Sequence, residues 1–340
     1  MTRPVIICCP TRNELHNLVK LLPAWLHYAN HVVIADQMSY DGTREFVSKY
    51  ENVHLVDNPD ADFNERNRIE LLVDRARSIS SSAALIFLDA DETLSANVSN
   101  SIEWKSFLNS PIGTTGSFAW ISLFDSVKRF NARGSSGRPS FANFGFIDDG
   151  RPLEGAGIMH GPRGPGLAKP TRTFRFHEIV NLHFFLTNRD VYRKKQNWYK
   201  LFWLRKGGKY FHINRNHTAQ DSITIDETDL SPREWFDGFE RSGFDLSSTE
   251  SSSLLWYDVE ILKYIASSGT RCLWLLDIWN QDWEHLRQLA KKAGHANIPT
   301  EPIRFPPPWI LRYTDWTLGR APMSQIRRSA FRFAQRRLLP

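Results

Sequence analysis

The segment Ala84-Leu85-Ile86-Phe87-Leu88-Asp89-Ala90-Asp91-Glu92 (residues 84–92) decides the fold. Its first five residues form an uninterrupted apolar run, which predicts a β-strand that is buried on both faces. Asp89 and Asp91 follow directly, where this strand ends. A strand of this kind belongs to a sheet whose two faces are covered, usually by helices. We therefore expect an α/β domain with acidic side chains at the end of one strand.

The residues before this segment alternate between short apolar runs and helical patterns. We interpret three apolar runs as earlier strands: 5–9, 31–35 and 53–56. The helical patterns show apolar residues at spacings of three and four, as for Leu15, Leu18, Leu22 and Trp25. Strands that alternate with helices in this way indicate a parallel sheet.

Polar residues follow the end of each expected strand. The segments are 10–14, 36–37, 58 onward and 89–92. In open parallel sheets, ligands bind in the crevice beyond the carboxyl ends of the strands. The sequence therefore predicts a ligand site that is built from these four segments.

Two aspartates one residue apart suit a divalent cation. Their oxygens are hard ligands of the kind that Mg²⁺ and Mn²⁺ prefer, and such a cation can bridge two phosphates. When a sugar leaves a nucleotide diphosphate, the cation acts as a Lewis acid on the departing group. A lone Asp-x-Asp triplet is common in solvated loops, but Asp89 and Asp91 follow the fourth strand of an α/β series. This position indicates a nucleotide diphosphate site that uses Mg²⁺ or Mn²⁺.

Three segments resemble family 2 glycosyltransferases of the GT-A fold, a Rossmann-like α/β fold. They are Pro10-Thr11-Arg12-Asn13-Glu14, the run Ala-Asp-Gln-Met-Ser-Tyr-Asp-Gly-Thr at 35–43, and Leu88-Asp89-Ala90-Asp91-Glu92. Their order and spacing match the family over residues 3–98, and the likeness continues loosely over 170–200. It implies a metal-dependent glycosyltransferase that moves a sugar, with inversion, from a nucleotide-sugar donor. The implied acceptor is a glycan, a lipid-linked sugar or a polysaccharide.

The resemblance also implies roles for residues of these segments. The residues implied to contact the nucleotide are Pro10, Thr11, Arg12 and Glu14. Asp36 would hold the base or ribose, Asp89 would face the ribose or the metal, and Asp91 would bind the metal. The family pattern after the second strand is Asp-Asp/Gly-x-Ser, and Gln37 and Met38 depart from it, which affects the expected donor contacts.

Basic and amide side chains extend the expected site. Asn64 and Arg68, after the third strand, either contact the base or diphosphate or are exposed helix residues. A later basic stretch either neutralises the diphosphate or forms a solvated helix face, and its members are Arg189, Lys194 and Lys195.

An inverting transfer also needs a carboxylate that takes the proton of the acceptor hydroxyl. Glu178 is the expected base, with Glu154 and Asp190 as alternatives. His183 resembles a histidine that completes the metal shell in GT-A enzymes, and a buried structural histidine is the other interpretation.

Two rival functions stay open. Asp89-x-Asp91-x-Thr93 also fits the nucleophile motif of haloacid-dehalogenase-like phosphatases, with Asp148 and Asp149 as the later pair. That motif normally follows the first strand of its sheet, whereas three strands are expected before Asp89. The other rival is a non-catalytic nucleotide-binding scaffold. The lack of a standard Glu-Asp pair favours it, and the Asp89/Asp91 pair disfavours it.

We expect a catalytic domain over residues 1–215 and a mostly helical extension over 216–340. Helices are predicted at 231–243, 252–267 and 280–293. The Gly-, Pro- and Arg-containing tract 161–166 is either a mobile lid or a disordered excursion.

The end of the chain is basic. No acidic residue follows Asp315, while the arginines there are Arg320, Arg327, Arg328, Arg332, Arg336 and Arg337. From Met323 the pattern predicts a basic amphipathic helix, which either lies on an anionic membrane surface or docks on its own domain. Peripheral membrane contact would suit a lipid-linked acceptor. No nucleic-acid-binding module is recognised, so we expect no nucleic-acid partner.

Composition indicates the cellular context. Cys8, Cys9 and Cys272 show no zinc-site spacing and fit a reducing compartment. The chain has a net charge of +6, and it lacks an apolar run of about 18 residues. We therefore expect a cytoplasmic enzyme, with at most peripheral contact at the inner face of the membrane.

Overall fold

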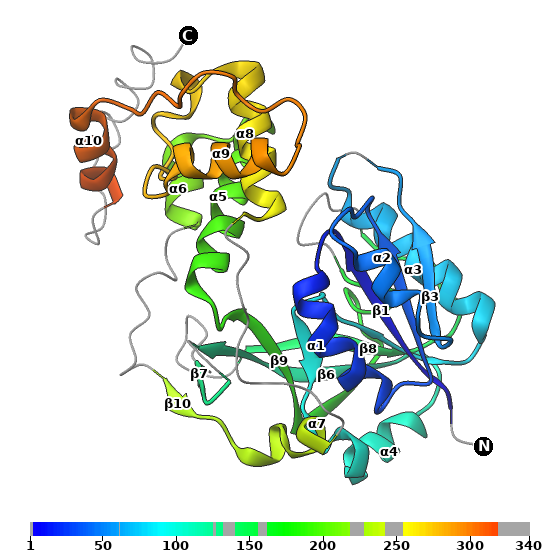
Figure 1. Ribbon diagram of the computed structural model, residues 1–340. Coiled ribbons are helices and arrows are strands. Elements are labelled where there is room, and N and C mark those ends of the chain that lie inside the picture. The colour runs from blue at the N-terminus through cyan, green and yellow to red at the C-terminus, as the bar shows by residue number, and fades with distance from the viewer. Residues whose placement is uncertain are drawn as a thin grey trace. The chain divides into compact units, whose positions relative to one another are not determined.

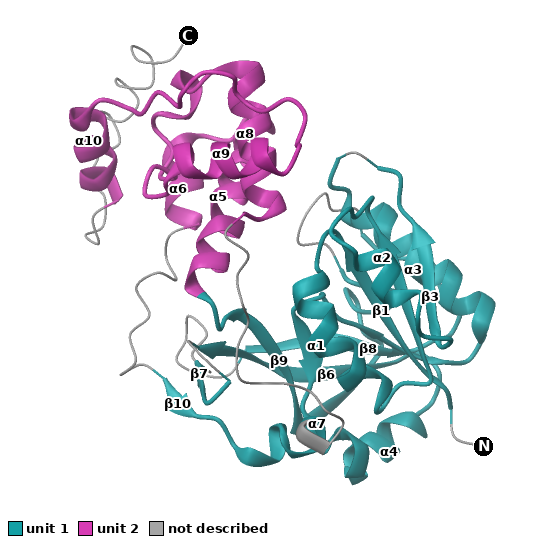
Figure 2. Ribbon diagram, in the orientation of Figure 1, with its two compact units in different colours: residues 1–188, 226–250 teal, residues 189–225, 251–340 magenta. Residues whose placement is uncertain are grey.

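The computed structural model describes residues 3–60, 62–124, 127–131, 140–155, 162–217, 228–241 and 254–318. The chain forms two compact units: unit 1 comprises 1–188 and 226–250, and unit 2 comprises 189–225 and 251–340 (Figure 2). This division differs from the predicted boundary near residue 215. Unit 2 begins at Arg189 because the helix that starts there packs against later helices, and residues 226–250 return to unit 1.

Unit 1 is built around one mixed sheet. Its strands are β1 (Val5–Thr11), β2 (His31–Asp36), β3 (Val53–Asp57), β4 (Ala84–Phe87), β5 (Glu92–Leu94), β6 (Thr114–Phe124), β7 (Arg129–Asn131), β8 (Ser140–Ile147), β9 (Arg172–Leu186) and β10 (Asp229–Leu230). Their order is β10-β7-β6-β8-β4-β1-β2-β3, and β9 pairs with β5 and β6 (Figure 1). Strands β3, β2, β1 and β4 are parallel, whereas β8 is antiparallel to β4 and β6.

Helices cover both faces of the parallel half of the sheet. They are α1 (Leu15–Leu26), α2 (Thr43–Val47) and α3 (Glu65–Ile79). Helix α4 (Ile102–Leu108) contacts β9, and α7 (Asp237–Arg241) contacts the 3-10 turns η1 (Ala96–Asn100) and η4 (Arg233–Trp235). Successive strand residues point to opposite faces. Ile7 packs in the core that contains Trp25 of α1, and Ile6 packs in the core that contains Leu72 of α3. The predicted α/β fold class is therefore confirmed.

Unit 2 is helical throughout its described residues. Its elements are α5 (Arg189–Arg205), α6 (Tyr210–Asn216), α8 (Trp256–Ser268), η5 (Arg271–Leu273), α9 (Trp283–Lys292) and α10 (Pro308–Leu318). They enclose an apolar core of their own, in which Ile261, Leu276 and Trp283 are fully buried. Over the ranges that the structure describes, no helix combines the length and hydropathy needed to cross a membrane.

The predicted C-terminal helices correspond to the structure in part. Helices α8 and α9 lie close to the predicted ranges 252–267 and 280–293. The helix predicted at 231–243 is instead η4 followed by α7, because Trp235 and Phe236 turn into the core of unit 1. The basic helix predicted from Met323 lies outside the described residues.

Candidate functional site

The carboxyl ends of β1, β2 and β4 meet at one edge of the sheet. The register of β1 and β2 pairs Thr11 with Asp36. On the other side of β1, the Leu88 amide donates to the Cys8 carbonyl at 3.1 Å. Because the three strands are parallel, the polar segments that follow them lie on the same side, as the sequence predicted.

The pKa of the Cys9 thiol, near the carboxyl end of β1, depends on the charged groups around it. Burial raises the pKa of Cys9 well above its ordinary value, and the carboxylates of Asp89 and Glu14 raise it further. Arg68 acts in the opposite direction, and Asp91 adds to the increase. Four of the residues that the sequence singled out therefore gather around the end of β1.

Asp36 is a fully buried carboxylate with one satisfied oxygen. Its Oδ2 accepts from the Ser39 amide at 3.1 Å and from Arg44 Nη1 at 2.8 Å. Its Oδ1 has no hydrogen-bond partner among the described residues, and the same is true of Thr11 Oγ1 and Asn13 Nδ2. Buried polar atoms without partners are costly, so these three atoms are available to a polar ligand.

The two residues that depart from the family pattern have structural roles. Gln37 Nε2 donates to the carbonyls of Asp60 and Asp62 at 2.8 and 2.9 Å, which ties the loop after β3 to the end of β2. Met38 has a φ of 53°, and so does Asn13 across the same edge. Non-glycine residues in the left-handed region are strained, and such residues cluster at functional sites.

Asn64 and Arg68 lie at the start of α3. Asn64 is the N-cap, and its Oδ1 accepts from the Asn67 amide at 3.2 Å. The Arg68 guanidinium stacks over Phe63 at 4.3 Å and lies 3.4 Å from Glu65. Both residues thus serve the local structure, and their contact with a donor stays a prediction.

The structure brings Asp91 and His183 together. Their Oδ1 and Nε2 atoms are 3.5 Å apart, because β5 pairs with β9 in a register that places Glu92 opposite His183. The imidazole stacks between Trp120 and Phe185, at centroid distances of 5.3 and 4.2 Å. This arrangement fixes the ring beside the carboxylate, while the role of the pair in metal binding stays a prediction.

Arg163 occupies the end of β4, and the sequence assigned it no role of its own. Its Nη2 donates to Asp89 at 3.0 Å and its Nη1 donates to Glu92, while the guanidinium faces Phe144 and Trp120. Burial lowers the pKa of Arg163, but the charges of Asp89 and Glu92 outweigh this effect and raise it above the ordinary value. The only feature of the sequence that pointed to this role was one arginine within a Gly- and Pro-rich tract.

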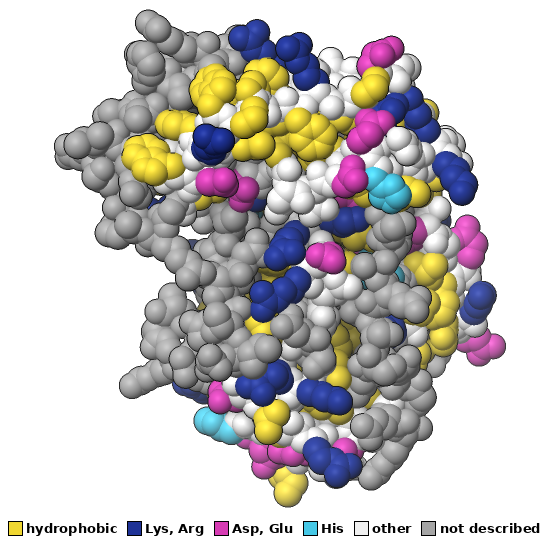
Figure 3. All heavy atoms as spheres, turned by 60° about the vertical axis from the view of Figure 1, so that its left-hand side comes forward, with side chains coloured by type: hydrophobic (Ala, Val, Ile, Leu, Met, Phe, Trp, Pro, Cys, Tyr) yellow, Lys and Arg dark blue, Asp and Glu magenta, His cyan; other side chains and the backbone are white. Residues whose placement is uncertain are grey.

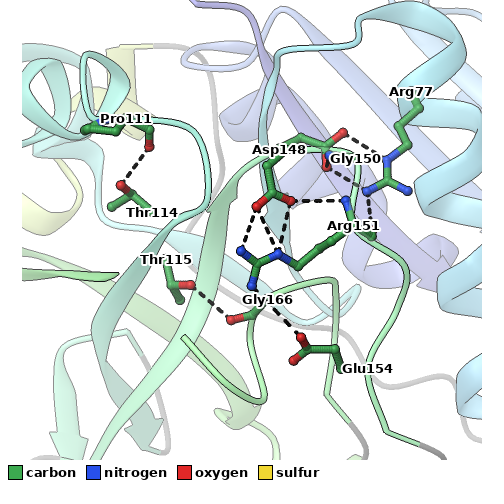
Figure 4. Close-up of polar contacts among 10 residues, drawn as sticks. Arg77, Pro111, Thr114, Thr115, Asp148, Gly150, Arg151, Glu154 and Gly166 are labelled. Carbon is green, nitrogen blue, oxygen red and sulfur yellow. Dashed lines mark hydrogen bonds and ion pairs between the residues drawn. The ribbon is translucent and has the colours of Figure 1, made fainter. Parts of the chain in front are cut away.

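Two glycines let the loop that carries Arg163 lie against the sheet. A Cβ on Gly164 would stand 2.2 Å from the Phe87 ring, and one on Gly166 would stand 2.4 Å from the Phe146 ring. Thr115 Oγ1 donates to the Gly166 carbonyl at 3.1 Å (Figure 4). From residue 162 on, the tract predicted as a lid or a disordered excursion is thus packed on β4, β6 and β8. Residue 161 lies outside the described residues.

The side chains present do not form a ready-made site for Mg²⁺ or Mn²⁺. Asp89 and Glu92 are engaged by Arg163, and Asp91 lies beside His183. Within the described ranges, no group of three or more His, Cys, Asp or Glu side chains is arranged to hold a metal ion. The cation inferred from the sequence therefore stays a prediction, and we derive no chemical step through it.

Glu178, the expected base, lies away from the end of β4. Its Oε2 accepts from Ser101 at 3.2 Å, and its amide donates to Glu103 at 2.9 Å. It precedes His183 by five positions on β9, and both of its side-chain and amide partners belong to the start of α4 and its N-cap. The structure therefore does not bring Glu178 together with the Asp-x-Asp carboxylates.

The other residues considered for catalysis and charge neutralisation belong to a loop of unit 1 or to unit 2. Glu154 lies 4.0 Å from Arg151 in the loop after β8. Asp190 is in the first turn of α5, in unit 2. Lys194 is buried in unit 2, where its Nζ lies 2.9 Å from Asp258, so its charge is used inside the helical core.

The aspartate pair of the phosphatase alternative stands at the wrong end of β4. The Asp148 amide donates to the carbonyl of Ala83, before the first residue of β4, whereas Asp89 follows its last residue. This separation is six residues, or about 20 Å along an extended chain. Asp148 is instead held by Arg77 through two hydrogen bonds of 2.9 and 2.8 Å (Figure 4). The residues of that motif are therefore not brought together.

No protein-family model and no curated protein matches the chain. Among solved structures, HddC from Yersinia pseudotuberculosis is similar, with 13% identity and a TM-score of 0.32 over 57% of this chain and 97% of that one. A putative glucose-1-phosphate thymidylyltransferase from Bacillus anthracis is similar with 9% identity and a TM-score of 0.35, over 56% and 94% of the two chains. Likenesses with TM-scores this low carry no argument about function.

Proposed function

We propose that unit 1 binds a nucleotide-sugar and transfers its sugar to a carbohydrate or lipid-linked acceptor. The observation that carries the proposal is the buried, half-satisfied carboxylate of Asp36 at the carboxyl end of β2, which β1 separates from the acidic end of β4. An acceptor atom in such a position is satisfied by a donor such as the N–H of a base or a ribose hydroxyl. The motif resemblance at 10–14, 35–43 and 88–92 supports the same ligand class.

The proposed reaction is a direct displacement at the anomeric carbon. The acceptor hydroxyl oxygen forms the new bond to this carbon, and the bond to the diphosphate oxygen breaks, so that the nucleoside diphosphate leaves with the electron pair. The hydroxyl proton passes to a carboxylate of the chain. The residues near the end of β4 would hold the donor so that the acceptor can approach from the opposite side.

Nucleotide binding is the first test of this function. A panel of UDP, GDP, ADP, CDP and dTDP and their common sugar conjugates is added to the full chain, and the melting temperature is recorded. A ligand that binds the native state raises the melting temperature. At least one nucleotide should do so, and a panel without effect would contradict the proposal.

The variant Asp36→Asn ties this binding to the site. Its amide oxygen can replace Oδ2 toward Arg44, while its NH₂ group stands where the available acceptor Oδ1 was. We expect the affinity for the nucleotide to fall at least about tenfold, since one hydrogen bond to a charged group is lost. Asp57→Asn is the matched control, because Asp57 also pairs with Arg44, at 2.7 Å, but is exposed. Equal binding by the two variants would refute the role of Asp36.

Transfer separates the enzyme from the scaffold alternative. A nucleotide-sugar that raises the melting temperature is incubated with candidate acceptors, and release of the nucleoside diphosphate is followed. An enzyme releases it in an acceptor-dependent manner. Binding with no release for any acceptor would favour the non-catalytic scaffold.

We also propose that unit 2 contacts a membrane surface, which would suit a lipid-linked acceptor. On α10 the side chains of Trp309, Arg312 and Trp316 lie on the exposed side, whereas Ile310 and Thr314 are buried. Hydrophobic side chains with basic ones among them gather on the upper part of the face in Figure 3. Tryptophan and arginine together suit the interface of an anionic bilayer, and the arginine-rich sequence after α10 adds the same charge.

A further inference from the structure

The end of β4 holds more negative charge than one cation neutralises. Asp89, Asp91 and Glu92 follow one another there, and the Arg163 guanidinium contacts two of them. Glu92 is fully buried, and its Oε2 also accepts from the Asp89 amide at 3.1 Å. A buried carboxylate of this kind is stable only with a charged partner. Arg163 is therefore a fixed part of the site.

The guanidinium of Arg163 retains donors that the described chain does not use. It has five N–H groups, and within the described residues its hydrogen bonds go to Asp89 and Glu92. The side chain is 21% exposed, so it is not closed off from solvent. A guanidinium in this state can bind a phosphate in the bidentate manner that Arg favours.

The surroundings hold this cation in place before any ligand arrives. The guanidinium faces the Phe144 ring at 4.9 Å and the Trp120 ring at 5.4 Å. Gly164, the next residue, lies so close to Phe87 that the loop has no room for a side chain there. A preorganised charge in a partly dry environment stabilises an anion more than a mobile one does.

Arg163 already bonds Asp89 Oδ2 and Glu92 Oε2, and a divalent cation would have to compete with it for these two oxygens. A cation bound through them would displace the guanidinium, while Asp91 already lies beside His183. We infer that Arg163 supplies the positive charge that holds the donor's diphosphate at the end of β4, so that nucleoside diphosphate binding does not require a divalent cation. This inference rests on the proposed function.

The test is calorimetric titration of the full chain with the nucleoside diphosphate that raises its melting temperature most, once in EDTA and once in Mn²⁺. The variants are Arg163→Gln and Arg163→Lys, with Arg66→Gln as a matched control. Arg66 is exposed and bonds Glu70 and the Gly155 carbonyl. If Arg163→Gln unfolds because Glu92 loses its partner, the double variant Glu92→Gln/Arg163→Gln is titrated in its place, since it no longer carries the unpaired buried carboxylate.

We expect wild-type affinity in EDTA to lie within about threefold of that in Mn²⁺, a difference under about 0.7 kcal/mol. Arg163→Gln should weaken diphosphate binding about 10- to 100-fold, since a charged hydrogen-bonding group is lost. Arg163→Lys should recover part of it, and Arg66→Gln should bind as the wild type does. The affinity for the corresponding nucleoside, which carries no phosphate, should stay unchanged in all variants. If Arg163 only supported the structure, its replacement would weaken nucleoside binding as well.

Two results would overturn the inference and differ from failure of the proposed function. Binding that appears only with Mn²⁺, or that is unchanged or tighter in Arg163→Gln, would show that a divalent cation holds the diphosphate. Nucleotide binding itself would then still support the proposed function. Absence of binding for every nucleotide, with and without Mn²⁺, would instead contradict both.

Discussion

Replacing Gly164 by Ala tests how the loop positions Arg163. The new Cβ would stand 2.2 Å from the Phe87 ring, whereas ordinary contact begins at 3.4 Å. Either the ring or the loop must therefore move by about 1.2 Å. Phe87 is nearly fully buried within β4, so we expect the loop to move. Overpacking of this size costs about 1–3 kcal/mol, which is roughly 2–12 °C in melting temperature for a unit of this size.

The displacement should also weaken nucleotide binding. A shift of about 1 Å is enough to break the Arg163 hydrogen bond to Asp89, which is 3.0 Å long. Calorimetric titration and thermal unfolding of the same preparation measure both effects. Gly150→Ala is the control, because its φ of 78° makes it strained as alanine while its Cβ would meet no atom within 4 Å. It should lose stability, by about 1 kcal/mol, without losing affinity. A Gly164→Ala protein with wild-type stability and affinity would refute the reasoning.

Three further predictions concern other parts of the chain. Arg77→Ala should lower the free energy of unfolding by about 2–3 kcal/mol in urea titrations, because it leaves the buried Asp148 carboxylate without its partner. This is somewhat below the usual range for buried pairs, since Arg77 is partly exposed. Adding Asp148→Asn should restore part of the loss, and no recovery would contradict the charge argument. Arg287 lowers the pKa of Glu284 to about 2, so the stability that this pair contributes is present above pH 4.5 and is lost as the pH falls toward 2. Glu284→Gln should therefore show a shallower decline of the urea midpoint over that interval, and an identical decline would remove Glu284 as a cause. Co-sedimentation with anionic liposomes should fall severalfold in the double variant Trp309→Ser/Trp316→Ser, and separately on deletion of residues 319–340. An unchanged pellet would count against membrane contact.

The parallel half of the fold could be predicted because its signals are local. Each buried strand is a continuous apolar run, as in Ile6 and Ile7 of β1, and each run ends where the polar site segments begin. The order of β1 to β4 follows from strands that alternate with helices. Residues 226–250 gave no such signal. Their return to unit 1 depends on Trp235 and Phe236, whose burial is set by a core far away in sequence.

The registers of β9 explain why one of two predicted site residues lies beside Asp91 and the other does not. Both His183 and Glu178 belong to β9, and both were expected near the Asp-x-Asp pair. The pairing of Glu92 with His183 brings the histidine to Asp91, and it leaves Glu178 beside Ser101 and Glu103. A spacing in sequence gives the distance between two residues of a strand. It does not give the residue of the neighbouring strand that either one faces.

The positive charge at the end of β4 is the part of the site that the sequence did not identify. Consecutive carboxylates such as Asp89 and Asp91 are visible in a sequence, and they imply that a positive charge lies nearby. The sequence does not show whether that charge is a metal ion or a side chain, since Arg163 lies far along the chain from these carboxylates and reaches Asp89 and Glu92 from a loop whose glycines pack against the sheet. In this structure Arg163 is the charged partner of the buried Glu92, and a buried carboxylate needs such a partner in the absence of any ligand. A side chain can satisfy that requirement throughout folding, whereas a bound ion satisfies it only after the site has formed.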